Sequence, residues 1–263
     1  MRLWRILNRQ SEFNDKRVLV TGASKGLGWV CAQFFERNGA RLIVTGRSQD
    51  KLEALHAGFQ FPEQHLIVAE DLLNQSGVAR LAARVNEFCG GVDIIIHCLG
   101  GGYGFRDPLL SWDQFSMLHS VNVAAGAEIN RLLIPAMQAQ GEGRVIHIGS
   151  IASQEATGSV GYNTVKSSLA AYVRSLGREL AASNVVVTGI LPGAFYAPEN
   201  AWQRLQARDP EVVKQFIENR LPRKKIADAG EILPLVALLA GAGASMMAGS
   251  CVAIDAGEGV SYV

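Results

Sequence analysis

The sequence contains little cysteine, and none of it is arranged to bind zinc. Its four cysteines are Cys31, Cys89, Cys98 and Cys251. None of them forms a C-x-x-C pair, and no histidine lies at zinc-ligand spacing from one of them. We therefore expect free thiols, a reducing compartment and no metal site.

The sequence also lacks an excess of charge and any long apolar run. Its net charge is +1 over 263 residues, which gives no electrostatic signature of nucleic-acid binding. The N-terminal MRLWRILNRQ is short, basic and mildly apolar, too short an apolar run for a signal peptide or a membrane span. We expect a cytoplasmic protein. Residues 1–15 are expected to be an N-terminal extension, either a tail or a segment docked on a neighbouring subunit, with an amphipathic surface helix as the alternative.

What the sequence does contain is a regular alternation of strand and helix patterns. With 48% hydrophobic and 19% charged residues it can bury a large core, and no linker, repeat or low-complexity segment divides it. The strands are continuously apolar, which is typical of a parallel sheet covered on both faces. The sequence therefore predicts one α/β domain over 16–263, a Rossmann doubly wound parallel sheet of about seven strands. The predicted strands are residues 17–22, 41–46, 65–72, 92–100, 143–150, 185–193 and 250–257.

A glycine-rich turn connects the first strand to the first helix. It reads T-G-A-S-K-G-L-G, with Gly22, Gly26 and Gly28 where the strand becomes a helix. Glycine permits a sharp turn and a close approach to a pyrophosphate, which the helix N–H groups and dipole also favour. The spacing G-x-x-x-G-x-G differs from the common G-x-G-x-x-G fingerprint. The turn predicts a nucleotide site, and the alternative is glycine required for packing alone.

The end of the second strand indicates which dinucleotide binds. An acidic residue there would hold the ribose 2′-hydroxyl of NAD, but the strand is followed by Arg47, and Lys25 lies inside the glycine turn. Two cations suit a 2′-phosphate, so we predict NADP(H) over the reading that both are solvated surface charges. Asp71, after the third strand, is expected to bind the adenine amino group or to cap the following helix.

Tyr162 and Lys166 are four residues apart at the start of a helical pattern. Residues with this spacing share a helix face, so a phenol and an ammonium can point into one site. The pKa of a free phenol is about 10, and a nearby ammonium lowers it. Such a phenol can exchange a proton with a carbonyl or an alcohol. The alternative is a surface lysine beside a half-buried tyrosine.

Taken together, these residues resemble the short-chain dehydrogenase/reductase family. The resemblance covers residues 16–257. Within the family, the sequence is most similar to the branch of 3-oxoacyl-carrier-protein reductases. The family's T-G-x-x-x-G-x-G matches residues 21–28, and its P-G after the sixth strand matches Pro192-Gly193. Its catalytic residues match Asn122, Ser150, Tyr162 and Lys166.

The resemblance implies hydride transfer at the nicotinamide C4 between NADP(H) and a carbonyl or alcohol substrate. Tyr162 would be the acid–base group, and Lys166 would lower its pKa and hold the nicotinamide ribose. Ser150 would hydrogen-bond the substrate oxygen, and Asn122 would anchor a water that connects Lys166 to solvent. The alternatives are that Ser150 only ends a strand, with Ser153 as a rival, and that Asn122 is a buried amide bonded to backbone. The implied cofactor contacts are Gly22, Ser24, Lys25, Gly26, Leu27, Gly28, Arg47, Asp71, Leu72, Gly100, Tyr162, Lys166, Pro192 and Gly193.

The sequence departs from the family at two places near this site. The usual N-N-A-G after the fourth strand is His97-Cys98-Leu99-Gly100, and the threonine that helps to hold the nicotinamide amide is Ala197. One cofactor contact is therefore in question. His97 and His147 lie in apolar strands, and we expect hydrogen-bonded core residues rather than ligands.

Substrate choice is expected to depend on residues 99–109, 151–160 and 194–225, the last acting as a lid that orders on binding. Its aromatic and basic residues could cover a sugar or meet an anionic substrate, or could simply form a charged helix pair. The substrate is left open between a 3-oxoacyl thioester and a sugar or nucleotide-sugar of surface-glycan biosynthesis. A non-catalytic NADP-sensing protein and non-redox chemistry on the same scaffold are the alternatives. The family also implies a homo-oligomer, a tetramer or a dimer.

Overall fold

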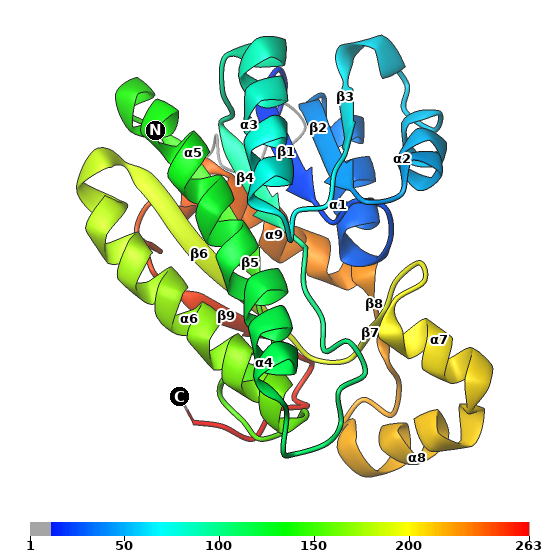
Figure 1. Ribbon diagram of the computed structural model, residues 1–263. Coiled ribbons are helices and arrows are strands. Elements are labelled where there is room, and N and C mark those ends of the chain that lie inside the picture. Colours follow the sequence, from blue (N-terminus) through cyan, green and yellow to red (C-terminus); the bar gives the residue numbers. More distant parts are fainter. Residues whose placement is uncertain (1–11, 263) are drawn as a thin grey trace, which may run out of the picture.

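A seven-stranded parallel sheet forms the centre of the computed structural model, which describes residues 12–262 (Figure 1). The strand order is β3-β2-β1-β4-β5-β6-β9, so the chain starts in the middle and winds outward in both directions. This confirms the predicted doubly wound fold. The strands are β1 (Arg17–Thr21), β2 (Arg41–Gly46), β3 (Leu66–Ala69), β4 (Ile94–His97), β5 (Gly143–Ile148), β6 (Val185–Pro192) and β9 (Cys251–Ile254).

Helices cover both faces of the sheet because successive strand residues point to opposite sides. The helices are α1 (Gly26–Arg37), α2 (Gln49–His56), α3 (Gln75–Cys89), α4 (Trp112–His119), α5 (Ala125–Gln140), α6 (Val160–Leu180), α7 (Ala201–Arg208), α8 (Pro210–Arg220) and α9 (Leu233–Ala240). In β1, Val18 and Val20 pack into the core with α1, α2 and α9, whereas Leu19 packs into the core with α3, α5 and α6. Figure 1 shows α3, α5 and α6 in front of the strands.

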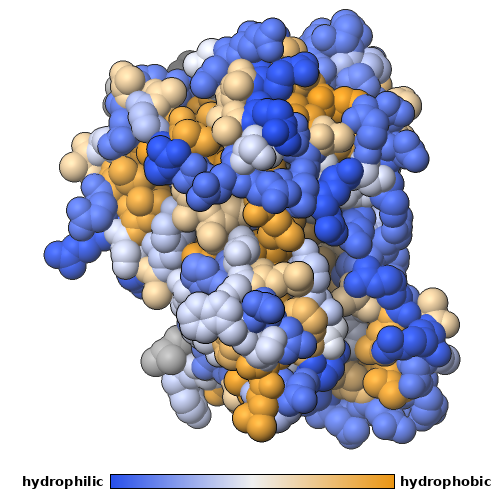
Figure 2. Space-filling view, viewed as in Figure 1, coloured by the Kyte–Doolittle hydropathy of each residue, from blue (hydrophilic) through white to orange (hydrophobic). Residues whose placement is uncertain are grey.

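The segment expected to be a lid contains more regular structure than its sequence predicts. Two short strands, β7 (Phe195–Tyr196) and β8 (Ala227–Asp228), pair in parallel on either side of α7 and α8. A small core of Val213, Leu221 and Ile226 holds this segment together. It forms the lobe at the lower right of Figure 1, with mixed apolar and polar side chains in Figure 2.

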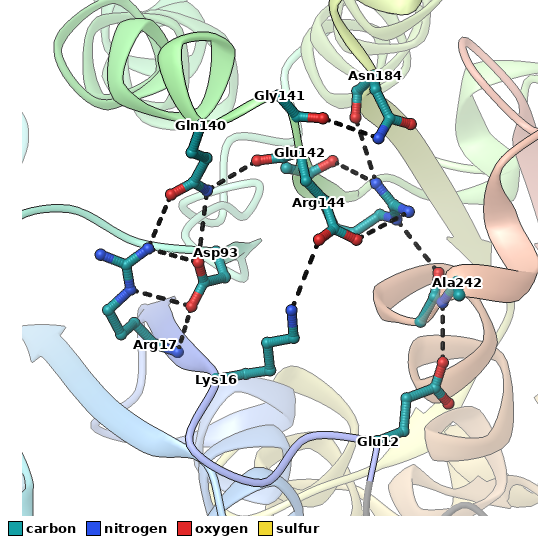
Figure 3. A network of polar contacts seen from close by, with 12 residues as sticks. Glu12, Lys16, Arg17, Asp93, Gln140, Gly141, Glu142, Arg144, Asn184 and Ala242 are labelled. Atoms are coloured by element: carbon teal, nitrogen blue, oxygen red, sulfur yellow. Dashed lines mark hydrogen bonds and ion pairs between the residues drawn. The ribbon is translucent and has the colours of Figure 1, made fainter.

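A polar network closes the amino ends of the strands (Figure 3). The Arg17 guanidinium donates to both carboxylate oxygens of Asp93, at 3.0 Å and 2.5 Å. The buried Arg144 guanidinium donates to the carbonyl oxygens of Gly143, Asn184 and Gly241. These contacts occupy the amino ends of the strands. A site can therefore form at the opposite end of the sheet, outside the carboxyl ends of the strands.

Two expectations concern parts of the chain outside this architecture. Residues 1–11, which make up most of the expected extension, lie outside the described residues. Phe13 follows them and is buried in the core beside Phe35 of α1. Within residues 12–262, no helix combines the length and the apolar character needed to cross a membrane.

Candidate active site

The glycine turn has the geometry expected of a phosphate site. Gly22 and Gly26 have φ values of 66° and 65°, in the left-handed region that favours glycine. A Cβ on Gly28 would lie 2.5 Å from the Gly22 carbonyl oxygen, so α1 packs directly on the turn. Within the described chain, no side chain caps α1 and no acidic residue occupies its first turn. The helix start therefore suits an anion.

The two predicted cations lie next to this turn. The Ala23 N–H donates to the Thr45 carbonyl oxygen at 3.0 Å, and a Cβ on Gly46 would lie 3.1 Å from the Ser24 hydroxyl. Arg47 follows Gly46 directly, so its backbone lies next to the turn that contains Lys25. Burial, and then the neighbouring cations, lower the pKa of Lys25.

Other predicted cofactor residues lie around the same edge of the sheet. Asp71 accepts hydrogen bonds from the Leu73 N–H at 3.2 Å and the Asn74 side chain at 2.9 Å, so its carboxylate shapes the turn into α3. Leu27 and Leu72 are buried. Asp71 therefore does not cap α3, whose N-cap is Asn74, but its carboxylate is engaged in the turn before that helix.

Tyr162 and Lys166 lie one turn apart on α6, with the Lys166 Nζ 5.7 Å from the Tyr162 ring centroid. Lys166 is 4% exposed and donates to the Ile148 carbonyl oxygen at 3.0 Å. Burial lowers the pKa of Lys166 to about 8. Burial raises the pKa of Tyr162, and a hydrogen bond with Ser150 opposes the rise.

The expectation that the ammonium lowers the pKa of the phenol is therefore not met by the protein groups alone. Burial is the larger effect, because the phenol lies in a low-dielectric site and the amine is bonded to a backbone carbonyl. The phenol stays protonated at neutral pH, which is the form that can donate a proton to a carbonyl oxygen.

Ser150 and Ser153 follow the end of β5 and differ in availability. The Ser150 hydroxyl accepts from the Ala152 N–H at 3.1 Å and lies beside the Tyr162 phenol. The Ser153 hydroxyl donates to the Ser150 carbonyl oxygen at 2.8 Å, so it is turned back to its own backbone. This geometry favours Ser150 over its rival as the substrate-facing hydroxyl.

Asn122 lies in a π-helical segment, Ser120–Ala124, between α4 and α5. Its Oδ1 accepts from the Gly101 N–H at 3.1 Å, and its Nδ2 donates to the carbonyl oxygens of Gly101 and Leu118 at 3.0 Å and 2.9 Å. A Cβ on Gly100 would lie 2.9 Å from Asn122 Oδ1 and 3.3 Å from Lys166 Nζ. Asn122 thus anchors the glycine-rich loop over the site, which matches the alternative of a buried amide bonded to backbone.

Behind the site, His97 and His147 are stacked with their ring centroids 4.3 Å apart. Asn130 of α5 joins them, with Oδ1 2.9 Å from His97 Nε2 and Nδ2 3.1 Å from His147 Nε2, and it also donates to the Tyr172 hydroxyl. Burial lowers the pKa of His97 to about 4 and lowers that of His147 as well. Both histidines are hydrogen-bonded core residues, as expected. The sequence analysis missed Asn130 and Tyr172, although an asparagine on the apolar face of a helix is a detectable signal.

A third residue that the sequence did not indicate is Glu258, which follows the last strand. Its Oε2 accepts from the Ala194 N–H at 2.6 Å, and a Cβ on Gly193 would lie 2.6 Å from the same oxygen. Burial raises the pKa of Glu258. The carboxyl group therefore holds the backbone just after Pro192-Gly193, and Ala197 is buried a few residues further on.

Comparisons with known proteins support the fold and indicate the family. A family model described as enoyl-(acyl carrier protein) reductase matches residues 22–258. An uncharacterized oxidoreductase of Staphylococcus haemolyticus is 29% identical over 84% of this chain and 97% of its own. Glucose 1-dehydrogenase of Gluconobacter oxydans is 28% identical over 94% of this chain and 93% of its own. The structure of L-sorbose reductase from Gluconobacter frateurii, complexed with NADPH and L-sorbose, superposes with a TM-score of 0.86 at 25% identity, covering 95% of this chain and 98% of that one.

Proposed function

Since the chain belongs to the short-chain dehydrogenase/reductase family of oxidoreductases, we propose that it is an NADP(H)-dependent reductase of a small carbonyl compound. One observation carries the proposal. Lys166 is buried and Tyr162 is half-buried on one face of α6, with Ser150 beside the phenol, at the end of the sheet where the glycine turn lies. An acid, a cation and a hydroxyl donor are the groups that carbonyl reduction requires.

The cofactor site of the proposal uses the start of α1 and the cations around it. The α1 N–H groups would hold the pyrophosphate, and Lys25 and Arg47 would hold the 2′-phosphate. Lys166 would hold the nicotinamide ribose. When bound, the nicotinamide supplies the hydride to the carbonyl carbon or accepts it from the alcohol.

The protein's own groups handle the proton. The Tyr162 hydroxyl donates its proton to the substrate oxygen as that oxygen gains charge. The Ser150 hydroxyl hydrogen-bonds the same oxygen, and the Lys166 ammonium stabilises the phenolate that remains. In the oxidative direction the phenolate takes the proton back from the alcohol.

For the substrate, we infer a sugar or a sugar-derived ketone, with a 3-oxoacyl thioester as the second candidate. The names of two relatives refer to glucose and L-sorbose, and one of these proteins was crystallised with NADPH. The lobe of α7 and α8 carries Trp202 and Phe216 as a tilted pair with centroids 4.3 Å apart, both partly buried, and aromatic rings of this kind can pack on a sugar ring.

The test is the rate of NADPH oxidation with a panel of ketoses and 3-oxoacyl thioesters, in the wild type and in Tyr162→Phe. The variant should lower kcat by about 10²–10⁴-fold and keep its affinity for NADPH, because it removes only the acid. Tyr262→Phe, fully exposed near the C-terminus, is the control and should change kcat little. Full activity of Tyr162→Phe would exclude the assigned acid. NADPH binding without turnover on any substrate would favour a non-catalytic sensor instead.

A further inference from the structure

We propose that the 2′-phosphate site extends beyond Lys25 and Arg47 to two more cations, Lys51 of α2 and Arg204 of α7, and that Glu199 occupies this site as an internal carboxylate. The proposal rests on the proposed function only in taking NADP(H) as the ligand. It assigns part of the phosphate site to the segment that covers the substrate.

The backbone brings the start of this segment onto the glycine turn. The Gly26 N–H donates to the Pro198 carbonyl oxygen at 2.7 Å, and Gly26 is one of the glycines of the predicted phosphate turn. Glu199 follows directly, so its side chain starts beside Lys25. The predicted phosphate turn is therefore in contact with the first residues of the expected lid.

Glu199 is held by two further cations. Its Oε2 forms an ion pair with Lys51 Nζ, and its backbone carbonyl accepts from Arg204 Nη1. The charges of Lys51, Lys25 and Arg204 all lower the pKa of the Glu199 carboxyl, so three cations lie around one carboxylate. Arg47 adds its charge to the same group through its effect on Lys25. The charges of Arg204, Lys51 and Arg47 all contribute to the lowered pKa of Lys25, although burial contributes most, and Glu199 only partly offsets them. A phosphate monoester carries a charge of about −1.5 to −2 and three acceptor oxygens, which suits this excess of positive charge.

Glu199 has a strained backbone conformation, as expected of a residue whose carboxylate is displaced by a ligand phosphate. Its φ is 53°, in the left-handed region that costs energy for a residue with a Cβ. The Gln203 side chain accepts from the Glu199 N–H at 2.9 Å, and Asn200 caps α7 through the Gln203 N–H at 2.9 Å. The start of α7 therefore fixes Glu199 at this position. Such strain is typical of functional sites.

The arrangement connects cofactor choice with the substrate lobe. Arg204 belongs to the same helix as Trp202, which contacts Phe216 of α8. A 2′-phosphate that replaces the Glu199 carboxylate would bind α7 through Arg204, whereas NADH offers a hydroxyl there. The competing interpretation is an exposed ion pair of little consequence, and it predicts no effect on cofactor choice.

The experiment is a fluorescence titration of the whole protein with NADPH and, separately, with NADH. We expect Arg204→Gln and Lys51→Gln each to raise the Kd for NADPH by about 10-fold, the loss of one charge-assisted contact, and to change the Kd for NADH by less than about 2-fold. Glu199→Gln should lower the Kd for NADPH by about 3-fold, because a competing carboxylate is removed. Arg208→Gln, at the other end of α7, is the matched control and should leave both values unchanged.

Arg204→Lys keeps the charge and should recover part of the NADPH affinity, which separates loss of the phosphate contact from damage to α7. Equal effects of Arg204→Gln on NADPH and NADH, or no effect on either, would overturn the proposal. So would a wild-type protein that binds NADH as tightly as NADPH, even if it reduces carbonyls with NADH. A protein that prefers NADPH in these titrations but turns over no substrate would refute the proposed function and leave this inference intact.

Discussion

Gly28 packs so closely on the turn before it that a Cβ there would lie 2.5 Å from an oxygen and 2.8 Å from a carbon of Gly22. We expect Gly28→Ala to displace the turn, lowering the affinity for NADPH at least about 10-fold and the Tm by several degrees. Titration and thermal unfolding followed by circular dichroism measure both. Gly58→Ala is the control, since a Cβ there would meet the Leu55 carbonyl oxygen at an ordinary 3.4 Å. Unchanged NADPH affinity in Gly28→Ala would contradict the proposed role of the turn.

Lys166 gives the reaction an expected pH limit. Its pKa is lowered to about 8 by burial, so the ammonium loses its proton as the pH rises through that value. The phenolate left by proton transfer would then have no cation beside it. We predict that kcat/KM for carbonyl reduction falls above pH of about 8, measured as NADPH oxidation across the pH range. In Lys166→Met this fall should disappear along with most of the activity. A wild-type profile that stays flat well above that pH would refute the assignment.

At this scale the residues of the proposed reaction were easier to predict from the sequence than the residues that hold the site in place. Tyr162, Lys166 and Ser150 stand in a short recognisable pattern, and the structure brings them together. Asn130 and Glu258 could not be assigned in the same way, because each acts on residues far away in the chain. The residues next to them in the sequence do not indicate which backbone group or ring they will contact.

At the scale of elements, the stacked histidines connect β4 and β5 to α5 and make stability depend on pH. The pKa of His97 is lowered from 6.5 to about 4, and that of His147 is lowered too, so the folded state holds both rings neutral. As the pH falls below 6.5 the unfolded chain takes up protons that the folded chain does not. The free energy of unfolding should then fall by about 1.4 kcal/mol per pH unit for each ring, and level off for His97 below its folded pKa.

Thermal unfolding between about pH 6.5 and about pH 4 tests this prediction. His97→Asn, which restores the residue expected in the family pattern, should reduce the slope of stability against pH because one of the two titrating rings is gone. His119→Asn changes an exposed histidine at the end of α4 and should leave the slope unchanged. An identical slope in His97→Asn and the wild type would show that the buried rings do not control acid stability.

Long apolar elements were predictable, whereas short or interrupted ones were not. Continuous runs such as 143–150 and 185–193 became β5 and β6 with small changes at their ends. β7 and β8 have two residues each, too few for any period to show. The π-helical segment Ser120–Ala124 lies inside a continuous helical pattern, and the contact of its Asn122 with the Gly101 backbone is not visible in that pattern.

At the scale of the whole molecule, we predict a homo-oligomer, a tetramer or a dimer. Large apolar side chains project into solvent from several parts of the described chain, including Trp112, 85% exposed, and Met246, 97% exposed. Exposed apolar surface of this kind is commonly covered by another copy. Size-exclusion chromatography with light scattering measures the mass, and Trp112→Lys with Met246→Lys should shift it toward the monomer. A monomeric mass for the wild type would contradict the prediction.

The overall architecture followed from the alternation of elements, but the docking of distant segments did not. The approach of Pro198 to Gly26 depends on how the lobe folds back onto the sheet. Neither segment carries a pattern that specifies the other, so the cation cluster around Glu199 emerges only in three dimensions.

The lobe of α7 and α8 has a small hydrophobic core of its own, formed by Val213, Leu221 and Ile226. In the described chain this core is separate from the two cores that flank the sheet. A unit that supports itself can be exchanged or can drift in sequence without disturbing the scaffold beneath it. Grafting residues 200–226 between relatives, with Arg204 retained, could therefore change the substrate of the proposed reaction and leave its hydride transfer unaltered.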